Sequence, residues 1–222
     1  MDGRTRATME AHYAALSREG GHSARCDMPL PEGLLGKRVL DLGCRGGKGA
    51  FKIADAVGPE GFVLGVDPSA EFIARAASRA ADRDASAERA SRLAFARGCF
   101  EDLRAAGAAD ASFDVVVVNS VLNLAWDLRS ALREIARVLV PGGFLFHKGV
   151  FARRPAEVGA NAAPPAGPGA SGEFARALDR ASFEALVLGA GFATCRFGPP
   201  SPAEGADAGS FYAAVVRAET PS

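Results

Sequence analysis

The sequence predicts an α/β fold in which helices cover both faces of a doubly wound, mostly parallel sheet. Short apolar stretches alternate with longer amphipathic ones, which is the order of strands and crossover helices in such a sheet. Four consecutive valines, Val115 to Val118, indicate a strand that is buried on both faces. The chain has 222 residues, a length that fits one domain with a sizeable core.

Each element follows from a local pattern of apolar residues and turn signals. Helical spacing of Met9, Tyr13 and Leu16 predicts a first helix, which Gly20-Gly21 would end. The predicted helices are residues 5–19, residues 48–57, a helix that Ser69 caps and that extends into the eighties, residues 128–139 and residues 182–188. The predicted strands are residues 37–42, 62–66, 93–96, 113–118, 144–150, 192–197 and 211–217.

The strand count gives a seven-stranded, Rossmann-like sheet. No helix separates the last two strands, so the last strand is expected to insert antiparallel. We treat residues 1–222 as one domain, in which the helix and loop of residues 1–36 would cover the site. The composition of residues 155–172 is dominated by Ala, Gly and Pro and has no periodicity. This pattern predicts a flexible loop that closes over a bound substrate.

Composition excludes several classes of function. Lys+Arg and Asp+Glu both number 26, so the chain has no basic footprint for nucleic acid. No apolar run approaches the roughly 18 residues of a membrane helix, and the N-terminus lacks a secretory signal. The four cysteines are widely spaced, which predicts reduced thiols, a cytoplasmic location and no metal site. The oligomeric state stays open.

A glycine-rich turn after the first strand marks the candidate site. The sequence VLDLGCRGGKGAF, residues 39–51, runs from a strand through Gly43 and Gly47 into a helix, but Arg45 replaces the usual middle glycine. Asp67 ends the second strand twenty residues after Gly47, where an acid can accept hydrogen bonds from a ribose diol. At this point the cofactor is either NAD or S-adenosyl-L-methionine.

Three features favour S-adenosyl-L-methionine. Asp41 stands two residues before Gly43, which resembles the D-x-G-x-G-x-G loop of class I methyltransferases. After the third strand, Glu101 is placed to meet an adenine amino group and Phe100 to stack on its ring. Residues 137–143, RVLVPGG, resemble the methyltransferase signature R-V-L-K-P-G-G. The expected cofactor-binding residues are Asp41, Gly43, Cys44, Arg45, Gly47, Asp67, Pro68, Phe100, Glu101 and Asn119.

Residues 98–127, GCFEDLRAAGAADASFDVVVVNSVLNLAWD, are similar to a motif region of the arsenite methyltransferase family. The resemblance implies methyl transfer from S-adenosyl-L-methionine. Most of the family's arsenic-binding cysteines are missing from this sequence. Ser120 occupies one cysteine position, Phe174 stands near another, and Cys26 falls near a third. We therefore expect a small-molecule acceptor, with a soft or thiol-type acceptor related to arsenite as one possibility.

The catalytic candidates are residues that would face the transferring methyl group. Asn119 and Ser120 end the fourth strand, Tyr13 with His12 lies on the first helix, and Cys26 is the remaining thiol candidate. His147 and Lys148 would either line the acceptor pocket or be solvated. The sequence leaves two outcomes for Arg45: it points outward or pairs with the cofactor carboxylate, or it fills the space that the cofactor needs.

Two other functions compete with methyl transfer. An NAD-dependent oxidoreductase would share the fold, but the sequence holds no Tyr-x-x-x-Lys pair or other recognisable hydride-transfer set. A catalytically silent methyltransferase-fold partner subunit would explain Arg45 and the missing cysteines.

Overall fold

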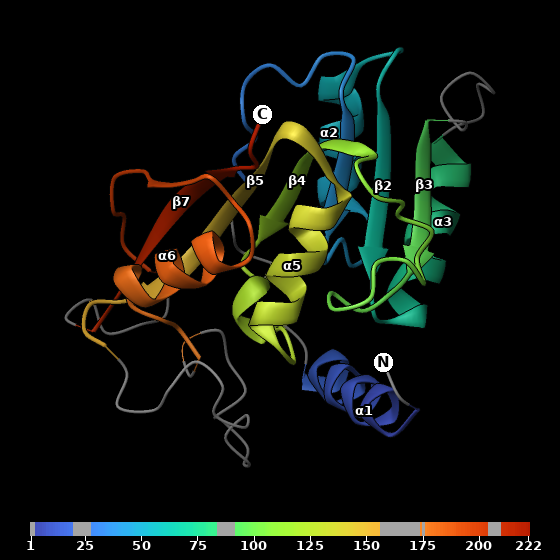
Figure 1. Ribbon diagram of the computed structural model, residues 1–222. Helices are drawn as coiled ribbons and strands as arrows, with labels where there is room; N and C mark the ends of the chain where they lie inside the picture. The colour runs from blue at the N-terminus through green and yellow to red at the C-terminus, as the bar shows by residue number, and fades with distance from the viewer. Residues whose placement is uncertain (1–2, 20–27, 84–91, 156–173, 175, 204–209) are drawn as a thin grey trace.

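The structure is a computed structural model that describes residues 3–19, 28–83, 92–155, 174, 176–203 and 210–222 (Figure 1). Its centre is a seven-stranded sheet of order β3-β2-β1-β4-β5-β7-β6. The strands are β1 (Arg38–Leu42), β2 (Phe62–Asp67), β3 (Leu93–Arg97), β4 (Phe113–Asn119), β5 (Leu139–Ala152), β6 (Thr194–Phe197) and β7 (Phe211–Glu219). The helices are α1 (Gly3–Glu19), α2 (Lys48–Val57), α3 (Ala70–Arg83), η1 (Leu122–Leu124), α5 (Leu128–Val138) and α6 (Arg180–Gly189).

The sheet confirms the predicted topology. Strands β1 to β5 pair in parallel, whereas β7 runs antiparallel to both of its neighbours, β5 and β6. Strand order reverses between β1 and β4, so the carboxyl ends of these two strands form the switch point where such sheets bind ligands.

The two faces of the sheet carry separate hydrophobic cores. Successive residues of β4 alternate between them: Val116 and Val118 join the core under α5 and α6, while Val115 and Val117 join the core under α2. In Figure 1, α5 and α6 lie in front of the sheet, and α2 and α3 lie behind it. The burial of both faces that the valine run predicted is confirmed.

Polar caps set the starts of three helices. Asp127 accepts a hydrogen bond from the Arg129 amide at α5, and Asp179 accepts hydrogen bonds from the first amides of α6. Ser69 caps α3 as predicted, since its Oγ accepts from the Phe72 amide at 3.3 Å. Strand β5 begins earlier than predicted, at Leu139, because Leu139 already pairs with Phe113 before the register shifts.

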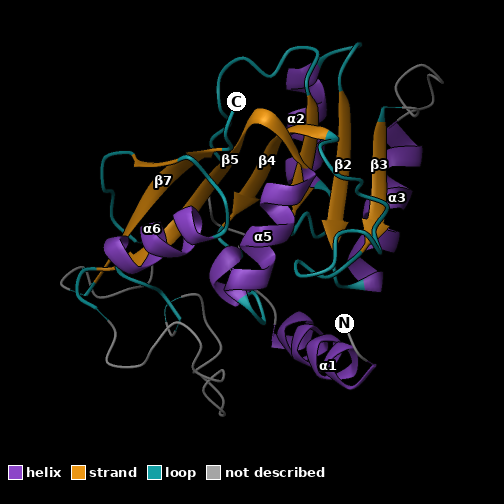
Figure 2. Cartoon of the chain, in the orientation of Figure 1, coloured by secondary structure: helices purple, strands orange, loops and turns teal. Residues whose placement is uncertain are grey.

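Helix α1 lies at the edge of the sheet where the parallel strands end (Figure 2). Met9 and Tyr13 are buried in the same core as α5, and the His12 ring bonds the Leu124 carbonyl at 2.8 Å. The catalytic candidate Cys26 and nearly all of the predicted 155–172 loop fall outside the described residues. Among the helices that the structure describes, none has the length and apolarity to span a membrane.

Candidate active site

The glycine loop between β1 and α2 needs its first and last glycines. Gly43 has a φ of 82° and Gly47 a φ of 84°, a left-handed region that side chains disfavour. A Cβ on Gly43 would lie 2.5 Å from a methyl carbon of Val121, and one on Gly47 would lie 3.0 Å from Phe51. The loop is fastened to β2 because the amides of Gly43 and Cys44 both donate to the Val66 carbonyl.

Arg45 is accommodated in this loop with a left-handed backbone, at a φ of 48°. Its amide donates to Asp67 Oδ2 at 2.9 Å, so the backbone turns toward the end of β2. Its guanidinium carbon lies 4.8 Å from the centre of the Phe72 ring on α3. The loop therefore keeps its fold, and a cation–π contact with α3 holds the Arg45 side chain.

A cavity of about 370 Å³ adjoins the loop. Asp41 from the end of β1 and Asn119 from the end of β4 both line it. The other lining residues come mainly from the glycine loop, α2 and α3: Met28, Gly43, Cys44, Arg45, Gly46, Lys48, Gly49, Lys52, Phe72, Arg75 and Arg79. The structure thus brings together five predicted cofactor residues, namely Asp41, Gly43, Cys44, Arg45 and Asn119.

Two buried acceptors at this cavity lack a donor. Asp41 Oδ2 and Asn119 Oδ1 are shielded from solvent and accept no hydrogen bond from any described residue. Burial raises the pKa of Asp41 to about 7, and the neighbouring charge of Asp67 adds to the rise. A buried acceptor without a donor is costly, so this pair is suited to a ligand that carries a cationic N–H group.

The acids expected to hold adenosine do not line the cavity. Asp67 accepts from the amides of Arg45 and Ser69, and burial raises its pKa while these two bonds lower it. Glu101 Oε1 accepts from the Tyr13 hydroxyl at 2.9 Å and from the Asp127 amide at 3.1 Å. Burial is also the largest cause of the raised pKa of Glu101. Both carboxylates are held by the protein itself.

Tyr13 fills the space beside these residues. Its ring meets Phe100 edge to face with centroids 5.2 Å apart, and both side chains are almost fully buried. Its hydroxyl is engaged with Glu101, and burial followed by the Glu101 charge raises its pKa well above the usual value. Tyr13 does not line the cavity, so its predicted place beside the methyl group stays a prediction. Pro68 does not line the cavity either, and its carbonyl accepts a hydrogen bond from Arg97 Nε at 3.0 Å.

His147 was expected either to line the acceptor pocket or to be solvated, but it is buried and does not line the cavity beside the glycine loop. Its ring is fully buried and stacked on Phe183 at 5.7 Å. Burial lowers its pKa to about 4, which keeps the ring neutral, and its Nδ1 pairs with the Val118 carbonyl. The strand does not end at this position, because β7 pairs with β5 as far as Ala152.

The described cysteines are poor candidates for thiolate ligands. Burial raises the pKa of Cys44 above its usual range, and it raises the pKa of Cys99 and of Cys195 to about 11. Ser120 is buried with a φ of 58° and is not among the cavity residues, and Phe174 packs against Phe211. Within the described part of the chain, no group of His, Cys, Asp or Glu forms a metal site.

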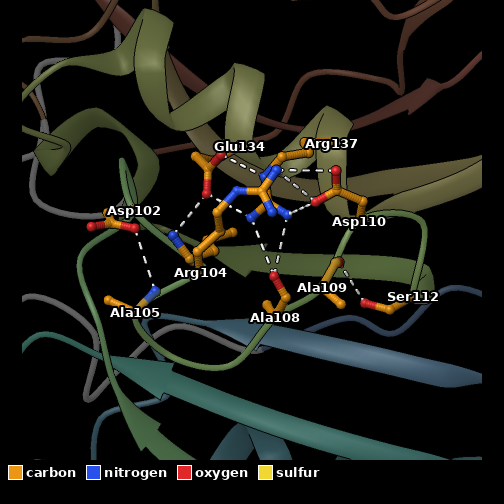
Figure 3. A network of polar contacts seen from close by, with 10 residues as sticks. Asp102, Arg104, Ala105, Ala108, Ala109, Asp110, Ser112, Glu134 and Arg137 are labelled. Atoms are coloured by element: carbon orange, nitrogen blue, oxygen red, sulfur yellow. Dashed lines mark hydrogen bonds and ion pairs between the residues drawn. The ribbon is translucent and has the colours of Figure 1, made fainter. Parts of the chain in front are cut away.

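A polar network fixes the loop that carries Glu101 (Figure 3). Glu134 on α5 accepts from the Leu103 amide at 2.8 Å, and it pairs with Arg137 one turn later at 2.6 Å. Arg137 also pairs with Asp110 at 2.5 Å and donates to the Ala108 carbonyl. The arginine of the RVLVPGG segment therefore has a structural role, tying the loop after β3 to α5.

Sequence reasoning missed the contribution of α3 to the cavity. Phe72, Arg75 and Arg79 all line it. Their spacing of three and four residues, directly after the expected ribose acid, places them on one face of a helix. That spacing is the signal that could have identified them.

Comparisons with known proteins agree with this geometry. Residues 35–160 match a family described as a methyltransferase domain. An arsenite methyltransferase of Aquipseudomonas alcaligenes is 44% identical over 131 residues, which cover 58% of this chain and 37% of that protein. The arsenite methyltransferase of Mus musculus is 33% identical over 128 residues, which cover 57% of this chain and 34% of that protein. The matched part thus spans little more than a third of these curated relatives.

A solved structure extends the likeness to nearly the whole chain. An arsenic(III) S-adenosylmethionine methyltransferase from Chlamydomonas reinhardtii superposes with a TM-score of 0.74 at 32% identity. The match covers 95% of this chain and 72% of that one. With the matched family spanning more than half of the sequence, the chain belongs to the methyltransferase-domain family, in the class I group that depends on S-adenosyl-L-methionine.

Proposed function

We propose that this protein transfers a methyl group from S-adenosyl-L-methionine to a small-molecule acceptor. The observation that carries the proposal is the pair of unpartnered buried acceptors, Asp41 Oδ2 and Asn119 Oδ1, beside the glycine loop. The amino-acid end of S-adenosyl-L-methionine carries an ammonium group that matches them. Lys48, exposed at the start of α2, offers a cation for the adjoining carboxylate.

The residues present therefore fit the cofactor. Asp41 and Asn119 would hold its ammonium group, and Lys48 its carboxylate. When bound there, the cofactor supplies an electrophilic methyl group on a sulfonium sulfur. The protein's own contribution is to fix this group and the acceptor relative to each other, which lowers the entropic cost of reaction.

The three thiols that the structure describes are poorly suited to bind an acceptor as thiolates. The described thiols, those of Cys44, Cys99 and Cys195, have raised pKa values and stay protonated near neutral pH. A soft or thiol-type acceptor related to arsenite is one candidate within this class, and the similarity to arsenite methyltransferases supports it. The neutral net charge supports a small molecule over nucleic acid.

The test begins with thermal unfolding of the whole chain with S-adenosyl-L-methionine, using NAD as the control. A ligand at a hundredfold excess over its dissociation constant adds about 2.7 kcal/mol. For a chain of this size the midpoint should rise by about 5–10 °C with S-adenosyl-L-methionine alone. No shift would contradict the proposal.

The second step measures the demethylated cofactor formed with arsenite, small thiols and other small acceptors. Turnover with one of them establishes the acceptor class. Cofactor binding without turnover across the panel would instead favour the silent partner subunit, for which Ser120 in place of a cysteine is the supporting observation.

A further inference from the structure

Helix α3 contacts two consecutive residues of the glycine loop. The Arg45 guanidinium lies over the Phe72 ring at 4.8 Å, and the Arg79 guanidinium donates through Nη1 to the Gly46 carbonyl at 2.9 Å. Phe72 and Arg79 are two helical turns apart and therefore lie on one face of α3. These contacts join the loop to an element that packs on β2 and β3, away from the loop's own strand and helix.

The loop needs such support at this place because Arg45 adopts a conformation that glycine adopts freely. At a φ of 48°, the Cβ of an arginine crowds its own backbone, whereas a glycine would not. The Arg45 amide bond to Asp67 holds the backbone from one side. The Phe72 ring holds the Arg45 side chain from the other side. This ring also lies 5.7 Å from the Arg75 guanidinium.

Relaxation of Arg45 would change the cavity directly. Arg45, Gly46 and Phe72 line the same cavity as Asp41, so a change in the loop backbone would change the shape of the space beside Asp41. A Cβ on Gly46 would lie only 2.9 Å from Arg79 Nη1, which shows how closely the Arg79 side chain approaches the loop.

We propose that Phe72 and Arg79 are positioning residues for the cofactor loop, which hold Arg45 and Gly46 in the shape that a middle glycine would give. This inference rests on the proposed binding of S-adenosyl-L-methionine at this cavity. Arg45 is thus compatible with the site because α3 supplies an aromatic ring and a guanidinium to fasten it.

The test is a double-mutant cycle read as the dissociation constant of S-adenosyl-L-methionine by calorimetry. Phe72→Ala should weaken binding about threefold to fivefold, since an exposed cation–π contact contributes a factor of that size. In an Arg45→Gly background, Phe72→Ala should leave the affinity nearly unchanged, because glycine needs no ring to hold its positive φ. Equal losses in both backgrounds would overturn the proposal.

The role of Arg79 is tested by comparing the cofactor affinities of two variants, Arg79→Lys and Arg79→Met. Arg79→Lys retains a donor for the Gly46 carbonyl and should bind the cofactor more tightly than Arg79→Met. The matched control is Arg92→Met, which removes a half-buried arginine whose ion-pair partner is Glu60, outside the loop. If Arg79→Met binds no more weakly than Arg92→Met, then Arg79 does not position the loop.

Hydrogen exchange separates this inference from the proposed function. The Gly47 amide is bonded to the Cys44 carbonyl at 2.9 Å, so its exchange rate reports the closed loop without any ligand. Phe72→Ala should speed this exchange, and Arg45→Gly should remove the effect. Failure of the native chain to bind the cofactor would refute the proposed function, while unchanged exchange in Phe72→Ala would refute the role of α3.

Discussion

The two halves of the candidate site are built in opposite ways. At the ends of β1 and β4, Asp41 and Asn119 each have a buried acceptor beside a cavity, with no donor among the described residues. At the end of β3, Glu101 is bonded by Tyr13 and Asp127, and Phe100 is covered by the Tyr13 ring. The difference teaches that burial alone does not identify a binding carboxylate, because one buried acid has an oxygen without a donor among the described residues and the other is bonded within the protein.

Removing the charge of Asp41 tests the half with free acceptors and should have the largest effect. A hydrogen bond to a charged group contributes about 1.5–3 kcal/mol, so Asp41→Asn should weaken S-adenosyl-L-methionine binding roughly 10- to 100-fold. Without ligand, the same variant should raise the unfolding midpoint at pH 8, since it removes a buried charge. A variant that binds as the native chain does would show that Asp41 is not a cofactor residue.

The next largest effect is the pH dependence of cofactor binding that the titration of Asp41 should cause. Its folded-state pKa of about 7 lies above the usual 3.8, so the folded protein binds this proton more tightly than the unfolded chain does. Its contribution to stability therefore falls as the pH rises from about 4 to 7. Cofactor binding, which needs the ionised form, should be about tenfold weaker at pH 6 than at pH 8. Asp41→Asn should remove this pH dependence of the dissociation constant, and a dependence that persists in the variant would assign it to another group.

Removing the Tyr13 hydroxyl tests the other half, and it should change stability with the opposite sign. Tyr13→Phe leaves Glu101 with fewer donors, which should cost about 1–3 kcal/mol and lower the midpoint by roughly 3–10 °C. The loss should shrink at acidic pH, where Glu101 becomes protonated. Trp126, the single tryptophan of the chain, has its amide 3.4 Å from the Tyr13 hydroxyl, so its emission reports whether α1 stays docked.

The comparison between the two halves of the site is contradicted by certain results for Tyr13→Phe. If Tyr13→Phe stabilises the chain, or if it binds S-adenosyl-L-methionine much more tightly, then Tyr13 competes with the cofactor for Glu101. The two halves would then be alike, with both carboxylates serving the ligand.

The smallest effect is expected at Ser120. Ser120→Cys restores the residue of the arsenite methyltransferase pattern, but Ser120 is not among the cavity residues. Its cofactor affinity should stay within about twofold of the native value, as for substitutions away from a binding site. A larger change in calorimetry would extend the binding site beyond the end of β4.

Sequence reasoning located the glycine loop and the Asp41–Asn119 pair because both depend on local signals. The loop follows from its glycines, and the pair follows from the carboxyl ends of two adjacent parallel strands. The partners of Glu101 could not be inferred, since Tyr13 lies 88 residues away and reaches it only when α1 docks. The burial of His147 depends on β7, whose pairing carries β5 past the position where a strand end was expected.

The position of β7 has a consequence for how the chain acquires its fold during synthesis. In the sheet that the structure describes, β6 pairs with β7 alone and β5 has β7 as its second neighbour. Both strands therefore present unpaired edges until residues 211–219 have left the ribosome. Unpaired edges are sites of aggregation. A pause in translation shortly before this segment would therefore prolong the exposure of both edges, and truncation within it would leave the sheet divided.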